Sequence, residues 1–245
     1  MITVNSADVF PSENAVYIGL SDGEKYRILL KDYENLPFNC KPDDCIDGKC
    51  IDGLIYFSKK YNIYKSAIAK LALTDIPKKQ LFQKLYFAVR QKYKDDKTEP
   101  ETLRDLCGLV CDEFEESGYI DDRRYASNKA KYLKEYKKYG AGRIKEYLYQ
   151  KGIPADIINE TLDDGFFSDD EGDLENMRAL LKKKYGVNLE RLDKSDCKAV
   201  QKAIHLLVRA GYKYQQAKNA VAAFLDEANT DYTDYTEGGD YEDEF

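Results

Sequence analysis

The sequence predicts a mostly α-helical protein, in which tandem three-helix repeats form an elongated, curved body behind a small N-terminal β-hairpin region. Three observations support this fold class. Apolar residues recur at three- and four-residue spacings from residue 54 onward, the predicted helices are short and end at glycine, and the same stop signals recur along the chain. Because helices of about ten residues are marginal in water, they must pack against one another.

Residues 1–53 are expected to form a β-rich leader followed by a loop. The segments AVYIGL (15–20) and KYRILL (25–30) flank the sequence SDGE. Its Asp22-Gly23 pair is typical of a hairpin turn. ITVNSADVF is the candidate for a further strand, and residues 35–53 are expected to be a loop.

The first three-helix repeat is predicted over residues 54–118. Its first helix is expected at about 54–73. Thr98 and Glu101 have the spacing of a capping box at the start of its last helix. That helix places a stripe of apolar residues on one face, and Gly118 is expected to end it in the left-handed conformation. The stripe consists of Leu103, Leu106, Cys107, Val110 and Phe114.

The second repeat is predicted over residues 119–165 and the third over 169–227. In the second repeat, Asp121 is expected to cap a helix and Asp122 to lie in its first turn. The segment IKEYLYQKGI (144–153) aligns with AIHLLVRAGY (203–212), which places Leu148 over Leu207 and Gly152 over Gly211. Successive units with equivalent stops indicate a stacked repeat protein.

Charge is distributed unevenly along the chain. The net charge is −7, but residues 228–245 carry seven acidic residues and no basic one. This tail is expected to be disordered because it has little to bury. A sharper hypothesis is that the tail mimics DNA and folds back on the basic repeat.

Basic residues are concentrated in the second repeat, where residues 121–151 hold ten Lys or Arg and four Asp or Glu. Such a field attracts phosphates or an acidic protein groove, although a charge run more often only solvates a helix face. The candidate binding residues are Arg123, Arg124, Lys129, Lys131, Lys134, Lys137, Lys138, Arg143, Lys145 and Lys151.

Tyrosines alternate with these basic residues, and two interpretations are open. Tyrosine rings can stack on exposed nucleobases, or they can pack in the core of the repeat. The residues concerned are Tyr125, Tyr132, Tyr136, Tyr139, Tyr147 and Tyr149.

The sequence shows no arrangement typical of catalysis, a metal or a cofactor. His205 is the single histidine, and Cys40, Cys45 and Cys50 lack the tight pairs of common zinc sites, so metal binding and oxidation sensing by these thiols both stay open. Cys107 and Cys111 are one helical turn apart and are expected in a core. No stretch has the roughly 18 apolar residues of a membrane helix. No secretion signal is recognised at the N-terminus, so a cytoplasmic location is expected.

Residues 118–153 resemble the RecX family of bacterial regulators of the RecA recombinase. The resemblance consists of a glycine–aromatic–apolar–Asp–Asp signature, a Gly-x-x-Arg-Ile step and a Lys-Gly-Ile stop. The positions that carry it as structural residues are Gly118, Tyr119, Asp121, Asp122, Tyr125, Gly140, Gly142, Ile144, Leu148 and Gly152.

This resemblance implies a non-enzymatic protein that lies along the RecA–DNA filament and often limits its growth or activity. A monomer is expected, although the sequence does not reveal the oligomeric state. The resemblance also implies affinity for single- or double-stranded DNA, and a role in homologous recombination, DNA repair and the SOS response. The charged loop 93–100 and the acidic tail depart from the family pattern. The alternative is a helical nucleic-acid-binding module that acts without RecA. An enzyme would need a convergent polar site, which the sequence does not show.

Overall fold

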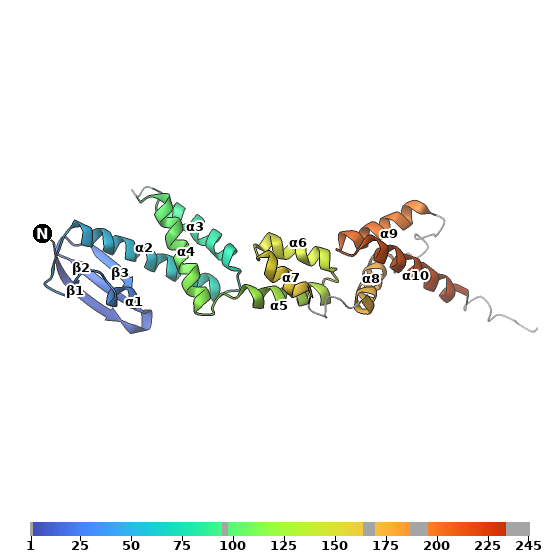
Figure 1. Ribbon diagram of the computed structural model, residues 1–245, viewed down its shortest axis with the longest axis horizontal. Helices are drawn as coiled ribbons and strands as arrows, with labels where there is room; N and C mark the ends of the chain where they lie inside the picture. Colours follow the sequence, from blue (N-terminus) through green and yellow to red (C-terminus); the bar gives the residue numbers. More distant parts are fainter. Residues whose placement is uncertain (1, 95–97, 164–169, 187–195, 234–245) are drawn as a thin grey trace, which may run out of the picture. The chain divides into compact units, whose positions relative to one another are not determined.

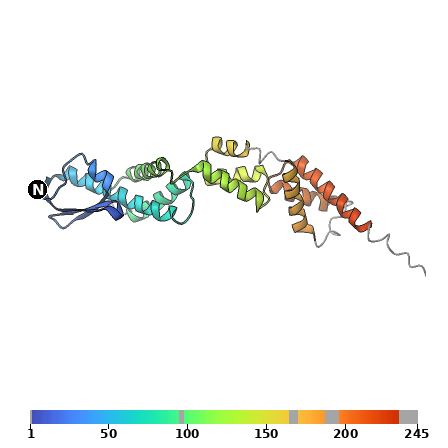
Figure 2. The ribbon, with the colours of Figure 1, turned by 90° about the horizontal axis from the view of Figure 1, so that it is seen from below.

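The computed structural model describes residues 2–94, 98–163, 170–186 and 196–233. The chain divides between Asp121 and Asp122 into two compact units. Figures 1 and 2 show that the first unit combines a small sheet with helices, whereas the described part of the second unit is helical. The predicted fold class, mostly α-helical repeats after a small β region, is confirmed.

The first unit begins with strands and ends with three helices. Its elements are β1 (Ile2–Phe10), η1 (Pro11–Glu13), β2 (Ala15–Leu20), β3 (Lys25–Leu29), α1 (Leu30–Glu34), β4 (Cys45–Ile46), α2 (Gly48–Leu71), α3 (Lys78–Lys92) and α4 (Pro100–Glu116). Part of the predicted 35–53 loop is therefore ordered as β4 and as the first residues of α2.

The sheet is antiparallel with the strand order β3-β2-β1-β4. The predicted hairpin joins β2 to β3, and Gly23 adopts a positive φ of 91° in its turn. Val16, Ile18 and Leu20 alternate toward the buried face of β2, as a half-buried strand requires. Helix α2 covers this face of the sheet (Figures 1 and 2), with Leu54 in the shared core.

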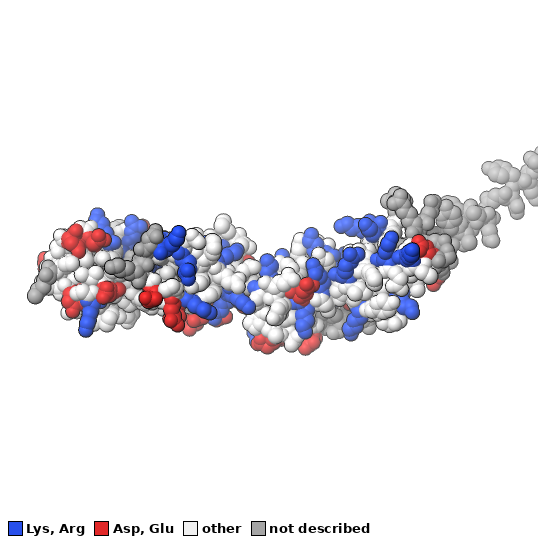
Figure 3. Space-filling view, turned by 90° about the horizontal axis from the view of Figure 1, so that it is seen from above, with Lys and Arg blue, Asp and Glu red and all other residues white. Residues whose placement is uncertain are grey.

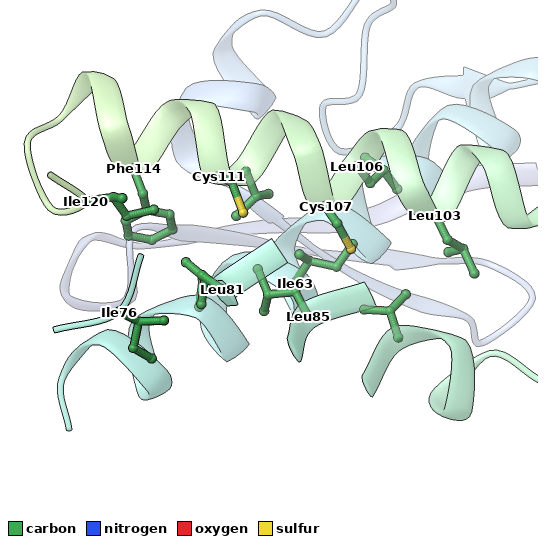
Figure 4. Packing of buried hydrophobic residues seen from close by; sticks show 13 residues of the cluster. Ile63, Ile76, Leu81, Leu85, Leu103, Leu106, Cys107, Cys111, Phe114 and Ile120 are labelled. Atoms are coloured by element: carbon green, nitrogen blue, oxygen red, sulfur yellow. The ribbon is translucent and has the colours of Figure 1, made fainter. Parts of the chain in front are cut away.

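Helices α2, α3 and α4 enclose the main core of the first unit. Figure 4 shows its side chains converging from all three helices, and Ile120 closes one end of the cluster. Every residue of the predicted α4 stripe is buried in this core. At the predicted capping box, α4 begins at Pro100, one residue later than expected, and its N-cap Glu99 makes no side-chain cap bond.

A buried ion cluster joins the leader to the helices. The ammonium of Lys60 on α2, only 4% exposed, lies 2.8 Å from Asp32 on α1 and 2.7 Å from Glu113 on α4. Lys31 reaches Glu113 at 2.7 Å. Burial alone would raise the pKa of Glu113, but the two lysines outweigh it and lower that pKa. The cluster therefore holds three elements together through charge.

The described part of the second unit contains two three-helix groups. The helices are α5 (Asp122–Glu135), α6 (Ala141–Lys151), α7 (Ala155–Asp163), α8 (Asp170–Tyr185), α9 (Cys197–Arg209) and α10 (Tyr214–Thr233). Helices α5 to α7 enclose one core, and α8 to α10 enclose another. Within the described part of the chain, no helix has the length and hydropathy needed to cross a bilayer.

The aligned stop signals of the second and third repeats have the same geometry. Gly152 ends α6 at a φ of 86°, and Gly211 follows α9 at a φ of 100°. In each case the next amide donates back to the aligned leucine carbonyl, Ile153 to Leu148 and Tyr212 to Leu207, both at 3.2 Å. This is the Schellman arrangement that a left-handed glycine permits, and the predicted equivalence is confirmed.

The C-terminal prediction needs one correction. Residues 228–245 were expected to be disordered, but α10 continues to Thr233. The predicted fold-back of the acidic tail falls mainly on residues 234–245, which lie outside the described residues.

Candidate nucleic-acid and filament interface

Most of the predicted basic residues lie on the surface of α5, α6 and the turn between them. On the face shown in Figure 3, basic side chains predominate over acidic ones on the second unit. The exposed candidates are Arg123, Arg124, Lys131, Lys137, Arg143 and Lys145, and the half-buried ones are Lys129, Lys138 and Lys151. These nine residues define the basic surface.

Lys134 does not belong to the basic surface. It follows Leu133 on the inner side of α5, is 5% exposed, and places its ammonium 3.3 Å from a carboxylate oxygen of Asp173 on α8. Its own backbone carbonyl accepts a bond from the Asn176 amide at 3.4 Å. The expectation that Lys134 faces a partner is corrected: it joins two repeats instead.

Two arginines of the basic surface already have carboxylate neighbours. Arg123 pairs with Glu160 on α7, and Arg143 pairs with Glu146 one turn along α6. Surface pairs of this kind contribute at most about 1 kcal/mol and are screened by salt. A phosphate or a partner carboxylate can therefore replace these partners at small cost.

A cleft lies between α5 and α6 and combines cations with aromatic rings. It has a volume of about 310 Å³, and we call it the aromatic cleft. The Lys129 ammonium lies 4.8 Å from the ring centre of Tyr132 and 5.6 Å from that of Tyr147. The Lys151 ammonium lies 5.4 Å from the Tyr147 ring. Cation–π contacts at this range hold the lysines over the rings.

The tyrosines of the second repeat divide into two groups. Tyr125, Tyr139 and Tyr147 are half-buried against the core of this repeat, as the packing interpretation expected. Tyr132, Tyr136 and Tyr149 are exposed. Of these six tyrosines, the three exposed ones have rings that a nucleobase of a partner could stack on.

Gly140 and Gly142 join the second repeat to the third through their backbone amides. The Gly140 amide donates to the Ala210 carbonyl at 2.9 Å, and the Gly142 amide donates to the Gly211 carbonyl at 3.1 Å. A β-carbon on Gly140 would lie 2.7 Å from the Gly211 carbonyl, and one on Gly142 would lie 2.9 Å from it. The sequence interpretation missed this joint, in which the start of α6 packs against the stop signal of α9.

Tyr212 completes the joint. Its hydroxyl donates to the Lys138 carbonyl at 3.0 Å. Burial raises the pKa of Tyr212, and Asp173 raises it further, so the hydroxyl stays protonated and available as a donor. Together with the Lys134–Asp173 pair, this bond connects α5 and its following turn to the third repeat.

The remaining residues of the predicted motif have structural positions. Asp121 directly precedes α5, and Asp122 lies buried in its first turn. Ile144 and Leu148 are fully buried in the core of the second repeat. The Gly118 backbone has a φ of 74°, and the following Tyr119 packs edge-on against Phe114.

The third repeat carries a further set of exposed cations that the sequence interpretation did not select. Residues 171–226 contain eleven Lys or Arg and seven Asp or Glu. A count of charged residues, which singled out residues 121–151, therefore also shows an excess of basic residues here. The described and exposed members are Lys182, Lys183, Lys184, Lys198, Lys202, Arg209, Lys213 and Lys218.

The cysteine thiols are free and do not form a metal centre with other ligands in the described part of the chain. Burial raises the pKa of Cys40 to about 11 and those of Cys107 and Cys111 to about 12. Since the thiolate is the reactive form, these three thiols are poor nucleophiles at neutral pH. Cys45 is exposed, which leaves it as the accessible thiol of the leader.

Comparisons with known proteins place the basic surface within a matched domain. The family model described as RecX, second three-helix domain, matches residues 121–162, which contain α5, α6 and all but the last residue of α7. The regulatory protein RecX of Clostridium botulinum (strain Alaska E43 / Type E3) is 32% identical over 111 residues. The resemblance to the RecX family is confirmed. That alignment covers 45% of this chain and 49% of the relative, so the chain spans about half the relative's length.

Solved structures of RecX proteins share the fold. The crystal structure of a regulatory protein RecX matches with a TM-score of 0.67 at 15% identity, covering 93% of this chain and 100% of that chain. RecX from Lactobacillus salivarius matches with a TM-score of 0.53 at 20% identity, covering 69% and 97%. The relative and the solved structures that this chain resembles are all named RecX.

Proposed function

We propose that this chain regulates a RecA-type recombinase by binding along the RecA–DNA filament, and that binding limits filament growth or activity. The proposal depends on one observation, the overlap in the sequence between the basic surface and the family match. The residues that match the RecX family model are the same residues that carry the basic surface. A filament on DNA offers both phosphates and acidic protein surface, and either would attract this set of cations.

The mechanism that we propose is occupation of the filament surface. Successive repeats contact successive recombinase subunits, and the basic surface faces phosphates or acidic side chains. The third repeat extends the set of cations available for this contact through Lys198, Lys202 and Lys218. No chemical step is required of the protein, and neither a cofactor nor a metal takes part.

Replacing Lys131, Lys137 and Lys145 together by glutamine tests the basic surface. All three side chains are exposed, so helical content should be unchanged. We expect about tenfold weaker binding to a RecA filament on single-stranded DNA at low salt, and a shallower salt dependence if these lysines contact phosphates. The measurement is the fluorescence anisotropy of the labelled protein titrated with preformed filament.

The matched control replaces Lys25, Lys41 and Lys49 by glutamine. These lysines are equally exposed but belong to the N-terminal leader, so the control makes the same change in net charge elsewhere. Equal weakening by both triple variants would mean that only net charge matters, and would refute the assignment of the basic surface.

The alternative function is a nucleic-acid-binding module that acts without RecA. The aromatic cleft favours it, because cations interleaved with tyrosines are suited to nucleic acid alone. Binding of the protein to RecA in the absence of nucleic acid separates the two functions, since only the first requires it.

A further inference from the structure

Tyr132 lines the aromatic cleft, and its exposed ring stacks on the ring of Tyr136, which is not itself a lining residue. The rings of Tyr132 and Tyr136 lie 5.3 Å apart with 27° between their planes. Tyr136 is 72% exposed and Tyr132 is 41% exposed. An aromatic stack left in water is a surface on which further flat, apolar rings can continue the stack.

The cleft behind this pair carries positive charge. Lys129, Lys137 and Arg143 line it, and the acidic residue in its lining is Glu146, which already pairs with Arg143. The lining therefore has a net positive charge. Cations placed beside stacking rings match a ligand that alternates phosphates with aromatic bases.

Gln150 supplies a neutral polar group on the α6 side of the same cleft. Its amide contains both donors and an acceptor, so it can meet the edge of a base without selecting one base strongly. Tyr147, half-buried and held under Lys129 and Lys151, forms a fixed inner wall. The cleft thus combines the fixed ring of Tyr147, a set of cations, and the exposed ring of Tyr132 with Tyr136 stacked on it.

We infer that the aromatic cleft binds single-stranded nucleic acid, with bases stacked on Tyr136 and Tyr132 and phosphates held by Lys129, Lys137 and Arg143. Bases in a duplex already stack on their neighbours within the helix, so they do not present their faces to a protein platform. The inference therefore adds a strand preference and a base-contacting site. It rests on the proposed function and deepens it, because it assigns the aromatic cleft to the nucleic acid of the filament rather than to the recombinase.

The test uses the full chain without RecA. Tyr132 and Tyr136 are changed together to leucine, which keeps apolar bulk but removes the rings. The control is Tyr149→Leu, since Tyr149 is also 72% exposed and lies on α6 outside the cleft lining. Three probes of equal length, about 20 nucleotides, are compared: a single-stranded oligothymidine, a duplex, and a single strand with abasic residues and the same phosphates.

We expect the unchanged protein to bind oligothymidine at least about tenfold more tightly than the abasic strand, and more tightly than the duplex. The double leucine variant should lose most of this difference, whereas Tyr149→Leu should stay within about twofold of the unchanged protein, as expected for a surface change away from the site. Circular dichroism of all variants checks that the helices persist.

Three outcomes would overturn the inference: equal binding of the abasic strand, equal binding of the duplex, or an unchanged preference in the double leucine variant. If the double variant instead loses binding to RecA without DNA, the platform is a protein contact. The proposed function is tested separately, by the binding of the lysine variants to the RecA filament. A negative result for the aromatic cleft would therefore not refute it.

Discussion

Gly211→Ala is expected to destabilise the joint between the second and third repeats by about 3 kcal/mol. A left-handed backbone costs roughly 1–2 kcal/mol in a residue with a side chain, and the Gly211 φ is 100°. A β-carbon there would also collide with the backbone nitrogen of Arg143, and such overpacking costs about 1–3 kcal/mol more. The change should loosen α6 from α9 while each three-helix core persists.

Amide hydrogen exchange measures this effect where it arises. The amides of Gly140 and Gly142 donate across the joint, so their exchange should become much faster in Gly211→Ala. Gly118→Ala is the matched control, because Gly118 also follows a helix at positive φ but has open space where the β-carbon would lie. Unchanged exchange at Gly140 and Gly142 would show that the joint is not a stabilising contact.

Lys60→Met is expected to lower the free energy of unfolding of the first unit by about 3–5 kcal/mol, the usual cost of removing one partner from a buried ion pair. The variant removes the cation that lies between the Asp32 and Glu113 carboxylates, and leaves the more exposed Lys31 paired with Glu113. Methionine fills a similar volume, so the loss arises from the carboxylates. Urea unfolding of the first unit, followed by a probe placed in α4, measures it.

The pH dependence of this loss identifies its cause. In the unchanged protein, folding lowers the pKa of Glu113 below its ordinary value. The ionised Glu113 therefore stabilises the fold at any pH above the ordinary pKa, and this stabilisation is lost as the pH falls through the lowered pKa. Without Lys60 the pKa of Glu113 loses one of the two lysines that lower it, so this carboxylate is protonated at a higher pH. The difference between the two proteins should therefore shrink as the pH falls from 7 toward 4. A difference that does not change with pH would mean that packing is responsible.

Local patterns predicted the parts of the fold that depend on neighbouring residues. The hairpin follows from Asp22-Gly23 between two apolar segments, and the stripe on α4 follows from helical periodicity. The shared stop at Gly152 and Gly211 was visible because each glycine closes its own helix. These features required no knowledge of distant contacts.

The parts that the sequence did not predict depend on partners far along the chain. The sequence pattern of α5 presents Lys134 as one more surface lysine, whereas in the structure it is buried and paired with Asp173 on α8, 39 residues further along the chain. Gly140 reads as a helix break, although it must also leave room for Gly211. The exposed cations of the third repeat are a different case: the sequence contains them, but basic residues are sparser over residues 171–226 than over residues 121–151.

The central claim, that this chain limits a RecA-type recombinase by binding its filament, is tested most directly by RecA-dependent ATP hydrolysis on single-stranded DNA. Adding the unchanged protein should reduce the rate, and the Lys131/Lys137/Lys145 glutamine variant should require about tenfold more protein for the same reduction. A rate that is unaffected by the unchanged protein, under conditions in which it binds the DNA alone, would contradict the claim and leave a nucleic-acid-binding module.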